Sequence, residues 1–333
     1  MPADAHPGHR CRGPLHCAVR APARTPGNRG TRDRSKGVGR LSRGRELLAG
    51  IVDYAGLFPP SELPMDDAVA EYARQRDSEA AWMLAGFVVP AGRLDELEAS
   101  REAIGAPGLW SLSVLLGPEP IDGLERVQAF VDRHPARYEV VAVEFRPVDP
   151  DAVTAVVTAA GHTIEVFAEL PWNEDPAPWM PALRDAGARA KIRTGGVTQD
   201  LFPPIEAVAR FLRVCADAGV GLKFTAGLHH PVRAEYPLTY EDDAPRGPMH
   251  GFLNVFVASA LLARESVDDA TLHALLAEED PSAFTLEPEG GVRWRDHHLG
   301  PEDVAQARRR FARSFGSCSF SEPVTDLQTL DLT

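Results

Sequence analysis

One lysine interrupts an otherwise apolar run in the segment VGLKFTAGLHHP, residues 220–231. An ammonium group is costly to bury unless an opposite charge or an acceptor compensates it, so Lys223 indicates a polar site. Lys191 occupies a similar run, RAKIRTGG, one predicted strand earlier. Two amines that lie close together disfavour each other's charge. We therefore expect Lys223 to be a neutral nucleophile that forms a Schiff base, with Lys191 lowering its pKa.

Carboxylates and guanidinium groups recur at the ends of neighbouring apolar runs. Glu144 and Glu169 are candidate general acids or bases, together with Asp53 in the first predicted strand, which is also a candidate for binding the substrate. Arg146 and Arg193 are suited to hold a substrate carboxylate or phosphate through two parallel hydrogen bonds. The other substrate-binding candidates are Thr225, the tryptophan Trp172, and the pair Gly195 and Gly196, whose backbone amides would approach an anion.

Histidines follow the Lys223 segment directly. His229 and His230 are adjacent, so in extended chain they point to opposite sides. We assign His229 to proton transfer and keep His230 as a substrate-binding candidate. A divalent metal such as Zn²⁺ or Mn²⁺, held by His229, His250 and Glu169, is the alternative, and otherwise no cofactor is implied. Cys318 is expected to be a small buried residue, because the sequence identifies no basic partner that would favour its thiolate form.

Short apolar runs alternate with amphipathic stretches from residue 47 onward, which is typical of βα units. We expect strands at 50–57, 81–89, 110–116, 138–146, 163–170, 188–194 and 220–226, with an eighth at 314–320. Helices are expected between them at 65–77, 92–103, 121–133, 150–160, 177–187 and 204–218. After a long loop at 228–250, of the kind that forms active-site lids, we expect helices at 251–263, 267–278 and 301–314 and a hairpin at 284–295. His297 and His298 are assigned to a surface loop.

Within these predicted strands, apolar and polar residues alternate. Lys191 and Arg193 fall on one face and Ile192 on the other, and Lys223 is opposite Phe224. A doubly wound sheet would instead have nearly unbroken apolar strands. A closed barrel has a polar interior with its site at the C-terminal strand ends. The sequence thus predicts an α/β fold, a (β/α)8 TIM-like barrel in one domain at 46–333, with a long insertion between strands 7 and 8.

Two simpler interpretations of the same alternation remain. An antiparallel sheet with one solvated face would show it, although the intervening helical stretches disfavour that arrangement. Inside a barrel, the lysines and carboxylates would also alternate if they only formed ion pairs with one another.

Composition narrows the class of partner. The chain has 333 residues, 44% of them hydrophobic, and a formal net charge of −13. The acidic balance argues against nucleic acid or an anionic membrane as partner and leaves a small anionic metabolite, with a homo-oligomer open. No apolar run approaches the roughly 18 residues of a transmembrane helix. Four cysteines without a framework spacing suggest a cytoplasmic protein. Residues 1–45, rich in Arg, Gly and Pro, are expected to form a disordered basic tail.

The stretch KFTAGL, residues 223–228, resembles the K-T-S-T-G-F strand of deoxyribose-phosphate-type class I aldolases. The resemblance implies a (β/α)8 barrel in which Lys223 forms the Schiff base, with Thr225 and Gly227 at the motif's second hydroxyl and glycine positions. In that family the second lysine follows on the next strand, whereas Lys191 precedes here. The body is also similar to bacterial proteins that carry KIRTGG and GLHHPVR, which implies no function.

The leading hypothesis is an enzyme that acts on a small anionic, carbonyl-bearing metabolite by lysine-assisted aldolase or lyase chemistry at the barrel mouth. A metal-dependent hydrolase or isomerase on the same scaffold is one alternative. A non-catalytic protein that binds an anionic ligand is the other. No Walker motif and no G-x-G-x-x-G follows a predicted strand, so a nucleotide is not implied.

Overall fold

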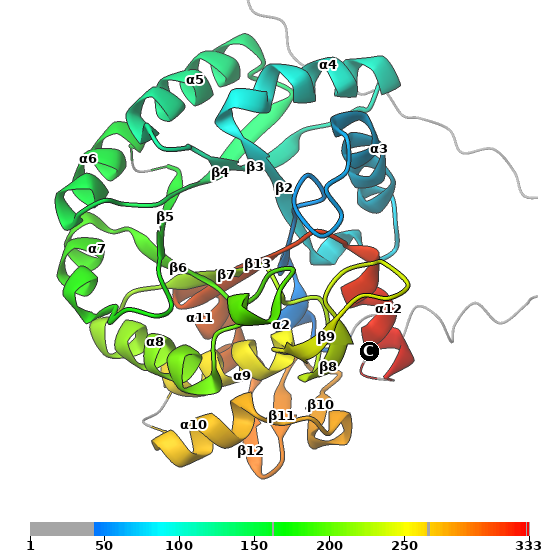
Figure 1. Cartoon of the computed structure of the whole chain (residues 1–333), viewed down its shortest axis with the longest axis vertical. Coiled ribbons are helices and arrows are strands. Elements are labelled where there is room, and N and C mark those ends of the chain that lie inside the picture. The colour runs from blue at the N-terminus through cyan, green and yellow to red at the C-terminus, as the bar shows by residue number, and fades with distance from the viewer. Residues whose placement is uncertain (1–42, 162, 265–266, 331, 333) are drawn as a thin grey trace, which may run out of the picture.

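Eight parallel strands close into a barrel in the computed structural model, which describes residues 43–161, 163–264, 267–330 and 332. Around the barrel the strand order is β1-β13-β7-β6-β5-β4-β3-β2 (Figure 1). The strands are β1 (Val52–Tyr54), β2 (Leu84–Pro90), β3 (Trp110–Leu115), β4 (Tyr138–Phe145), β5 (Glu165–Leu170), β6 (Arg189–Arg193), β7 (Leu222–Thr225) and β13 (Ala312–Ser317). The predicted (β/α)8 TIM-like barrel is confirmed.

Helices lie between successive strands and form the outer ring seen in Figure 1. They are α3 (Met65–Arg76), α4 (Leu94–Ile104), α5 (Pro120–Arg133), α6 (Pro150–Ala160), α7 (Met180–Ala186) and α8 (Ile205–Ala218). Helix α8 shows why these segments form helices that pack on the barrel. Its residues Val208, Leu212 and Cys215 share one buried face, while Glu206 is exposed. Gly219, at φ 68°, ends this helix in the left-handed conformation that glycine adopts without strain.

The predicted insertion between the seventh and eighth barrel strands is also confirmed. It contains β8 (Ala234–Pro237), β9 (Arg246–Met249), α9 (Phe252–Arg264), α10 (Asp269–Leu276), β10 (Phe284–Leu286), β11 (Val292–Trp294), β12 (His297–Leu299) and α11 (Pro301–Arg310). The loop expected at 228–250 therefore holds an antiparallel pair, β8 and β9. The assignment of His297 and His298 to a loop was wrong, because both lie in β12, which pairs with β11.

The remaining elements are short or terminal. They are α2 (Arg45–Leu48), α12 (Ser321–Thr329) and the 3-10 helices η1 (Ala81–Met83), η2 (Ala91–Arg93), η3 (Ala177–Trp179), η4 (Gln199–Leu201) and η5 (Pro281–Ala283). The predicted disordered tail, 1–45, falls mostly outside the described residues. Gly44 nevertheless belongs to the folded body, because its N–H donates to the Glu287 carbonyl at 3.3 Å.

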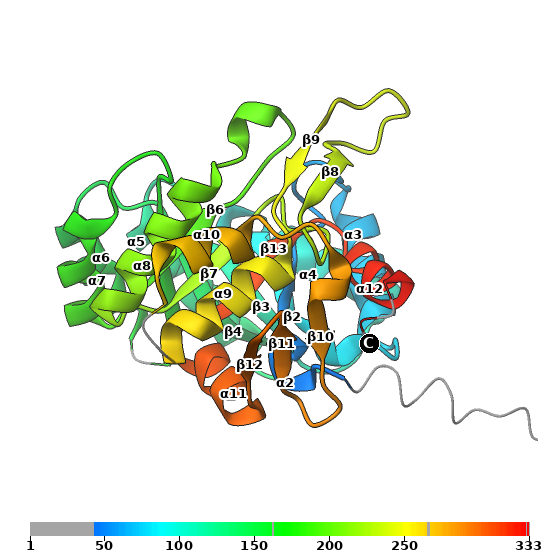
Figure 2. The same ribbon diagram turned by 90° about the horizontal axis from the view of Figure 1, so that it is seen from below.

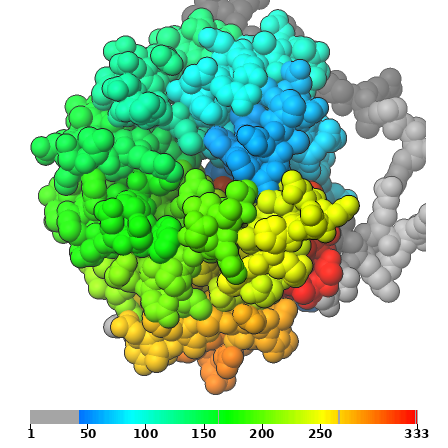
Figure 3. All heavy atoms as spheres, viewed as in Figure 1, coloured from blue at the N-terminus to red at the C-terminus, as the bar shows by residue number. Residues whose placement is uncertain are grey.

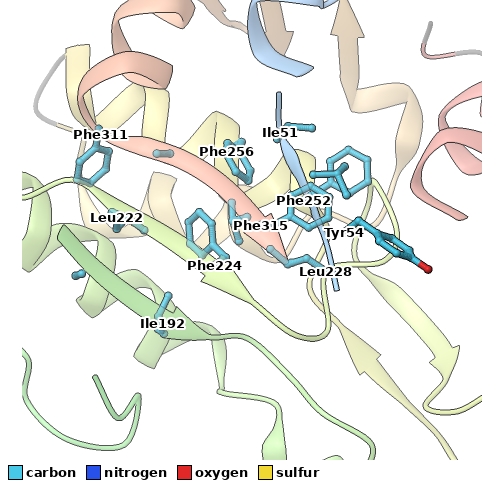
Figure 4. Close-up of a cluster of buried hydrophobic side chains, with 14 of the residues drawn as sticks. Ile51, Tyr54, Ile192, Leu222, Phe224, Leu228, Phe252, Phe256, Phe311 and Phe315 are labelled. Atoms are coloured by element: carbon cyan, nitrogen blue, oxygen red, sulfur yellow. The ribbon is translucent and has the colours of Figure 1, made fainter. Parts of the chain in front are cut away.

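The apolar faces of the strands pack outward against helices. Figure 4 shows Phe224 of β7 and Phe315 of β13 next to Phe252 and Phe256 of α9. The rings of Phe224 and Phe256 are 5.3 Å apart, and those of Phe252 and Phe315 are 5.2 Å apart. Since these outward positions take the apolar side chains, the barrel interior is left for polar ones.

The two ends of the barrel differ. In Figure 2 the β8–β9 pair stands at one end of the barrel, and α2 and α11 lie at the other. The β8–β9 end is the one at which the barrel strands finish, because this pair follows β7 in the chain. Within the described ranges, none of the helices combines the length and the apolar character needed to cross a membrane.

We expect Phe256→Ala to lower the free energy of unfolding by about 3–5 kcal/mol, because it leaves a cavity between α9 and the barrel. Urea unfolding of the full chain measures this loss. Ile121→Ala, at a position 41% exposed on α5, is the matched control and should cost less than about 1 kcal/mol. Similar losses in both variants would contradict the packing described for α9.

Candidate active site

A row of alternating charges crosses the barrel interior. Lys223 Nζ lies 2.6 Å from Asp53 Oδ2 and 2.7 Å from Glu144 Oε1. Lys191 Nζ lies 2.6 Å from Glu144 Oε2 and 2.7 Å from Glu169 Oε2. These side chains come from β1, β4, β5, β6 and β7. The predicted convergence of polar side chains from successive strands is therefore confirmed. We call this row, Asp53–Lys223–Glu144–Lys191–Glu169, the interior ion chain.

Hydroxyl and guanidinium groups complete the bonding of its carboxylates. Ser113 Oγ donates to Glu144 Oε1, and Ser314 Oγ donates to Asp53 Oδ2, both at 2.6 Å. Arg146 donates to Glu169 Oε1 from Nε at 2.9 Å and from Nη2 at 2.6 Å. Buried charges are tolerated when their remaining lone pairs and protons are satisfied in this way.

The sequence-based expectation for the Lys223 pKa was wrong in direction. Burial by itself would lower this pKa, but the contacts with Asp53 and Glu144 outweigh burial and raise it above its usual range. The physical reason is that Glu144 lies between the two ammonium groups, so attraction to a carboxylate replaces the expected repulsion. Burial would raise the pKa of Glu144, but Lys191 and Lys223 together hold it well below its usual range.

A cavity of about 730 Å³ opens at the C-terminal end of the barrel strands. Figure 3 shows this face hollowed near its centre. Its polar lining includes Glu144, Arg146, Glu169, Lys191, Arg193, Lys223, Thr225, Gly196, His229 and Cys318. Among its apolar lining residues are Phe58, Val88, Leu115, Phe145, Val197 and Leu201. Most of the predicted catalytic and substrate-binding residues therefore meet around one hollow.

Positive charge exceeds negative charge around this cavity. Four basic side chains, of two lysines and two arginines, face two carboxylates, and the arginines are the more exposed. The Arg146 side chain is 70% exposed and the Arg193 side chain 37%. Within the described part of the chain, the contacts of Arg193 are long, 3.5 Å from Nη1 to the Gly195 carbonyl and 4.0 Å from Nε to Glu169 Oε1. Its guanidinium group keeps donors for an anionic ligand.

Several predicted substrate-binding residues lie away from the cavity. Asp53 is directed to a second cavity, of about 340 Å³, which Arg308 and Arg313 also line. His230 stacks on Tyr236, with ring centroids 3.4 Å apart, and its Nδ1 lies 2.5 Å from Asp326 Oδ2. Trp172 packs partly buried against the core. His230 and Trp172 are thus outside the lining of the larger cavity, where the sequence analysis placed them.

Gly195 serves close packing and does not line the cavity. A Cβ atom there would lie 2.8 Å from the Cα of Gly227, in the loop that follows the next strand. The loops after β6 and β7 thus touch at two glycines. Gly196 does line the cavity, so the expected approach of backbone amides to an anion applies to one glycine of the pair.

The alternative metal ligands do not converge. His229 Nδ1 lies 3.1 Å from Glu322 Oε2, and His250 Nε2 lies 2.8 Å from the Pro203 carbonyl, while Glu169 is held by Lys191. Burial lowers the pKa of His250 to about 4. In the part of the chain that the structure describes, no three His, Cys, Asp or Glu side chains are grouped to hold a metal ion. The proposed set of His229, His250 and Glu169 was wrong.

One arrangement escaped the sequence analysis. Cys318 Sγ lies 3.9 Å from His229 Nδ1, so the basic partner that seemed missing is a residue 89 positions earlier in the chain. His229 follows β7, and Cys318 follows β13, which pairs with β7 in the barrel. The usable signal was the predicted adjacency of the seventh and eighth strands, which brings together the residues just beyond their ends.

Comparisons with known proteins identify no family for this chain. No family model matches the chain, and no curated protein matches it. Among solved structures, it is similar to a deoxyribose phosphate aldolase from Aeropyrum pernix, described as tetrameric, with 14% identity and a TM-score of 0.45. The match covers 88% of this chain and 98% of the aldolase chain. At this level of similarity nothing about activity or assembly is transferred.

Replacement of Glu144 should expose the repulsion that it now prevents. We expect Glu144→Gln to lower the free energy of unfolding by about 3–5 kcal/mol, because two buried ammonium groups then face each other with one carboxylate fewer. Glu139→Gln, at an exposed position of the same strand, is the control and should cost less than about 0.5 kcal/mol. A cost below about 1 kcal/mol for Glu144→Gln would contradict the shared-carboxylate arrangement.

The wild type and the Glu144→Gln variant also test how the stability of the protein depends on pH. Because the pKa of Glu144 is lowered by folding, its contribution to stability is present above the ordinary glutamate pKa of about 4.3 and declines as the pH falls below that value. We expect the difference in free energy of unfolding between wild type and Glu144→Gln to shrink between pH 5 and pH 3, both values being about one unit from that pKa. A constant difference over this range would contradict the assignment.

Proposed function

We propose that the protein is an enzyme that acts on a small anionic, carbonyl-bearing metabolite by lysine-assisted carbon–carbon bond or enolate chemistry of the aldolase or lyase type. The observation that carries this proposal is that two lysine amines, each within 2.7 Å of two carboxylates, line a cavity that also has arginines at its rim. An amine, proton acceptors and an anion clamp are what Schiff-base chemistry requires.

Use of lysine here is selective. The whole sequence contains three lysines among 35 basic residues, and two of the three stand side by side in the barrel, paired in register on β6 and β7. Arginine supplies nearly all other positive charge, but a guanidinium group cannot lose its proton in a protein. A reaction at a side-chain nitrogen therefore requires lysine, and not arginine, at these two positions.

The ion pairs favour Lys191 as the nucleophile. Both of its carboxylates are shared with another cation, Glu144 with Lys223 and Glu169 with Arg146. Lys223 has Asp53, which accepts a hydrogen bond from the neutral hydroxyl of Ser314 and has no other cation in direct contact among the described residues. Lys223 is therefore the lysine whose ammonium form its neighbours favour, and Lys191 is the nucleophile of the proposed reaction.

The proposed steps follow from these contacts. Glu169, 2.7 Å away, accepts a proton from Lys191, and the free amine attacks the substrate carbonyl carbon. The nitrogen of the adduct then passes a second proton to Glu144. Glu144 and Glu169 deliver these two protons to the former carbonyl oxygen, which leaves as water and gives the iminium ion. Lys223 stays charged and stabilises negative charge on the substrate, while Arg193 and Arg146 bind its anionic group.

Binding without catalysis is the second candidate. Its support is that the interior ion chain is complete without any ligand, each lysine having two carboxylate partners. In that case the lysines only hold the barrel together, and the rim arginines alone bind the anion.

Borohydride trapping separates the two candidates. We expect pyruvate, glyoxylate or glyceraldehyde 3-phosphate, with borohydride, to leave a reduced adduct on Lys191 of the full chain, located by peptide mass spectrometry. Lys191→Met should abolish the adduct, whereas Lys223→Met should slow its formation by about 10²-fold or more, as loss of one charge-stabilising group does. Lys36, outside the described residues, is the internal control for nonspecific labelling. An adduct on Lys223 alone would reverse the assignment, and no adduct with any probe would favour binding without catalysis.

Arg193 should govern anion affinity. We expect oxalate and inorganic phosphate to raise the melting temperature of the wild type, and Arg193→Gln to weaken their apparent affinity about 10- to 100-fold, since a charge-assisted hydrogen bond contributes about 1.5–3 kcal/mol. Arg210→Gln, whose guanidinium bonds to carbonyls of Trp172 and Glu174, is the matched control. Equal weakening in both variants would contradict an anion site at Arg193.

A further inference from the structure

A thiol and an imidazole occupy one wall of the same cavity, where the chain leaves β7 and β13. Cys318 and His229 are 5% and 6% exposed, and both line the cavity. Cys318 Sγ lies 3.9 Å from His229 Nδ1 and 3.5 Å from the Tyr240 hydroxyl. The mechanism described above does not use the thiol.

A carboxylate orients the imidazole and maintains its charge. Glu322 Oε2, from α12, lies 3.1 Å from His229 Nδ1 and accepts a hydrogen bond of 3.1 Å from Tyr240. Burial would lower the pKa of His229, but Cys318 and Glu322 outweigh burial and raise it to about 10. Its neighbours thus favour the imidazolium form of His229.

The cation in turn favours the thiolate. Burial would raise the pKa of Cys318, but His229, with help from Ser61 and Tyr240, outweighs burial and lowers it. Cys215 provides the contrast within the same chain, because burial in the core raises its pKa with nothing to oppose it. The pKa values of the two thiols are thus shifted in opposite directions, because one thiol lies next to an imidazole.

We propose that Cys318 is a nucleophilic thiolate, paired with the His229 imidazolium that Glu322 positions, and that it takes a small anion bearing an electrophilic carbon. Arg193 and Arg146 line the same cavity and supply the preference for an anion. This inference is independent of the lysine chemistry, since it needs neither Lys191 nor Lys223 to react.

The chemistry at the thiolate is simple addition or displacement. With a carbonyl group, the sulfur attacks the carbon, an S–C bond forms, and the π electrons move to the oxygen, which takes a proton from His229 to give a hemithioacetal. With iodoacetate, the S–C bond forms as the C–I bond breaks, and iodide leaves with the electron pair. Neither step needs an oxidant or a reductant.

Alkylation of the full chain tests the proposal. After timed treatment with iodoacetate or iodoacetamide, a tryptic digest places Cys318 in peptide 314–333 and Cys215 in peptide 214–223, so one experiment reads both. We expect Cys318 to react with a pH midpoint below the ordinary thiol value of about 8.5, and Cys215 to stay unmodified in the folded protein. Iodoacetate should react faster than iodoacetamide at Cys318, because the cavity is cationic.

Two variants assign the causes. His229→Gln should raise the midpoint and slow alkylation at pH 7 by about tenfold or more, a lowering of the thiol pKa by one unit being a tenfold change in thiolate. Arg193→Gln should slow iodoacetate and leave iodoacetamide unchanged. If His229→Gln fails to fold, the wild-type pH profile decides alone.

Three results would overturn the proposal: a folded wild type in which Cys318 is as unreactive as Cys215, a midpoint at or above the ordinary thiol value, or a folded His229→Gln variant with an unchanged profile. The lysine mechanism is tested separately. Lys191→Met should retain the alkylation of Cys318, and Cys318→Ser should retain borohydride trapping at Lys191.

Discussion

The interior ion chain is the constraint on which the rest of the barrel depends. Charged groups buried this deeply are stable only as ion pairs, because contact with the next ion offsets the desolvation cost of each one. Asp53, Lys223, Glu144 and Lys191 are each 3% exposed or less. The chain joins five strands of the barrel, so a change in the stagger of any of them would leave an unpaired charge inside. The arrangement that positions the site thus also defines the barrel.

The convergence of these groups could be predicted, but their pairing could not. Period-two alternation determines which face of each strand is polar, and parallel strands bring their C-terminal ends to one edge. Lys191 and Lys223 are paired in register on neighbouring strands, which is why sequence reasoning expected repulsion. Glu144 belongs to β4, two strands from β6 around the barrel. Its side chain crosses the barrel interior and lies between Lys191 and Lys223. Contacts across a barrel depend on tilt and stagger, which local sequence does not encode.

Loop residues were the least predictable part of the site. Barrel elements matched their expected positions within a few residues, because helical and strand periodicity are local signals. His230 and Trp172 carried suitable chemistry and a suitable place in the sequence, yet loop packing directs them elsewhere. The partnership of Cys318 with His229 depends on the closure of the barrel between β7 and β13. Glu322 lies in α12, a helix that the sequence analysis did not foresee.

The charged groups inside the barrel and those at the rim of the cavity have different roles. The interior ion chain and Arg146 balance to zero, three carboxylates against two lysines and one arginine. His229 and Glu322, 3.1 Å apart, form a separate pair at the cavity wall. Of the basic side chains that line the cavity, Arg193 has the longest contact with a carboxylate, 4.0 Å from Nε to Glu169 Oε1, on a chain whose formal net charge is −13. At physiological salt, charges farther than about 8 Å are largely screened, so the acidic exterior has little influence inside the mouth. In the function that we propose, anion selectivity is consequently a local property of the rim, separable from the lysines and the thiol beneath it.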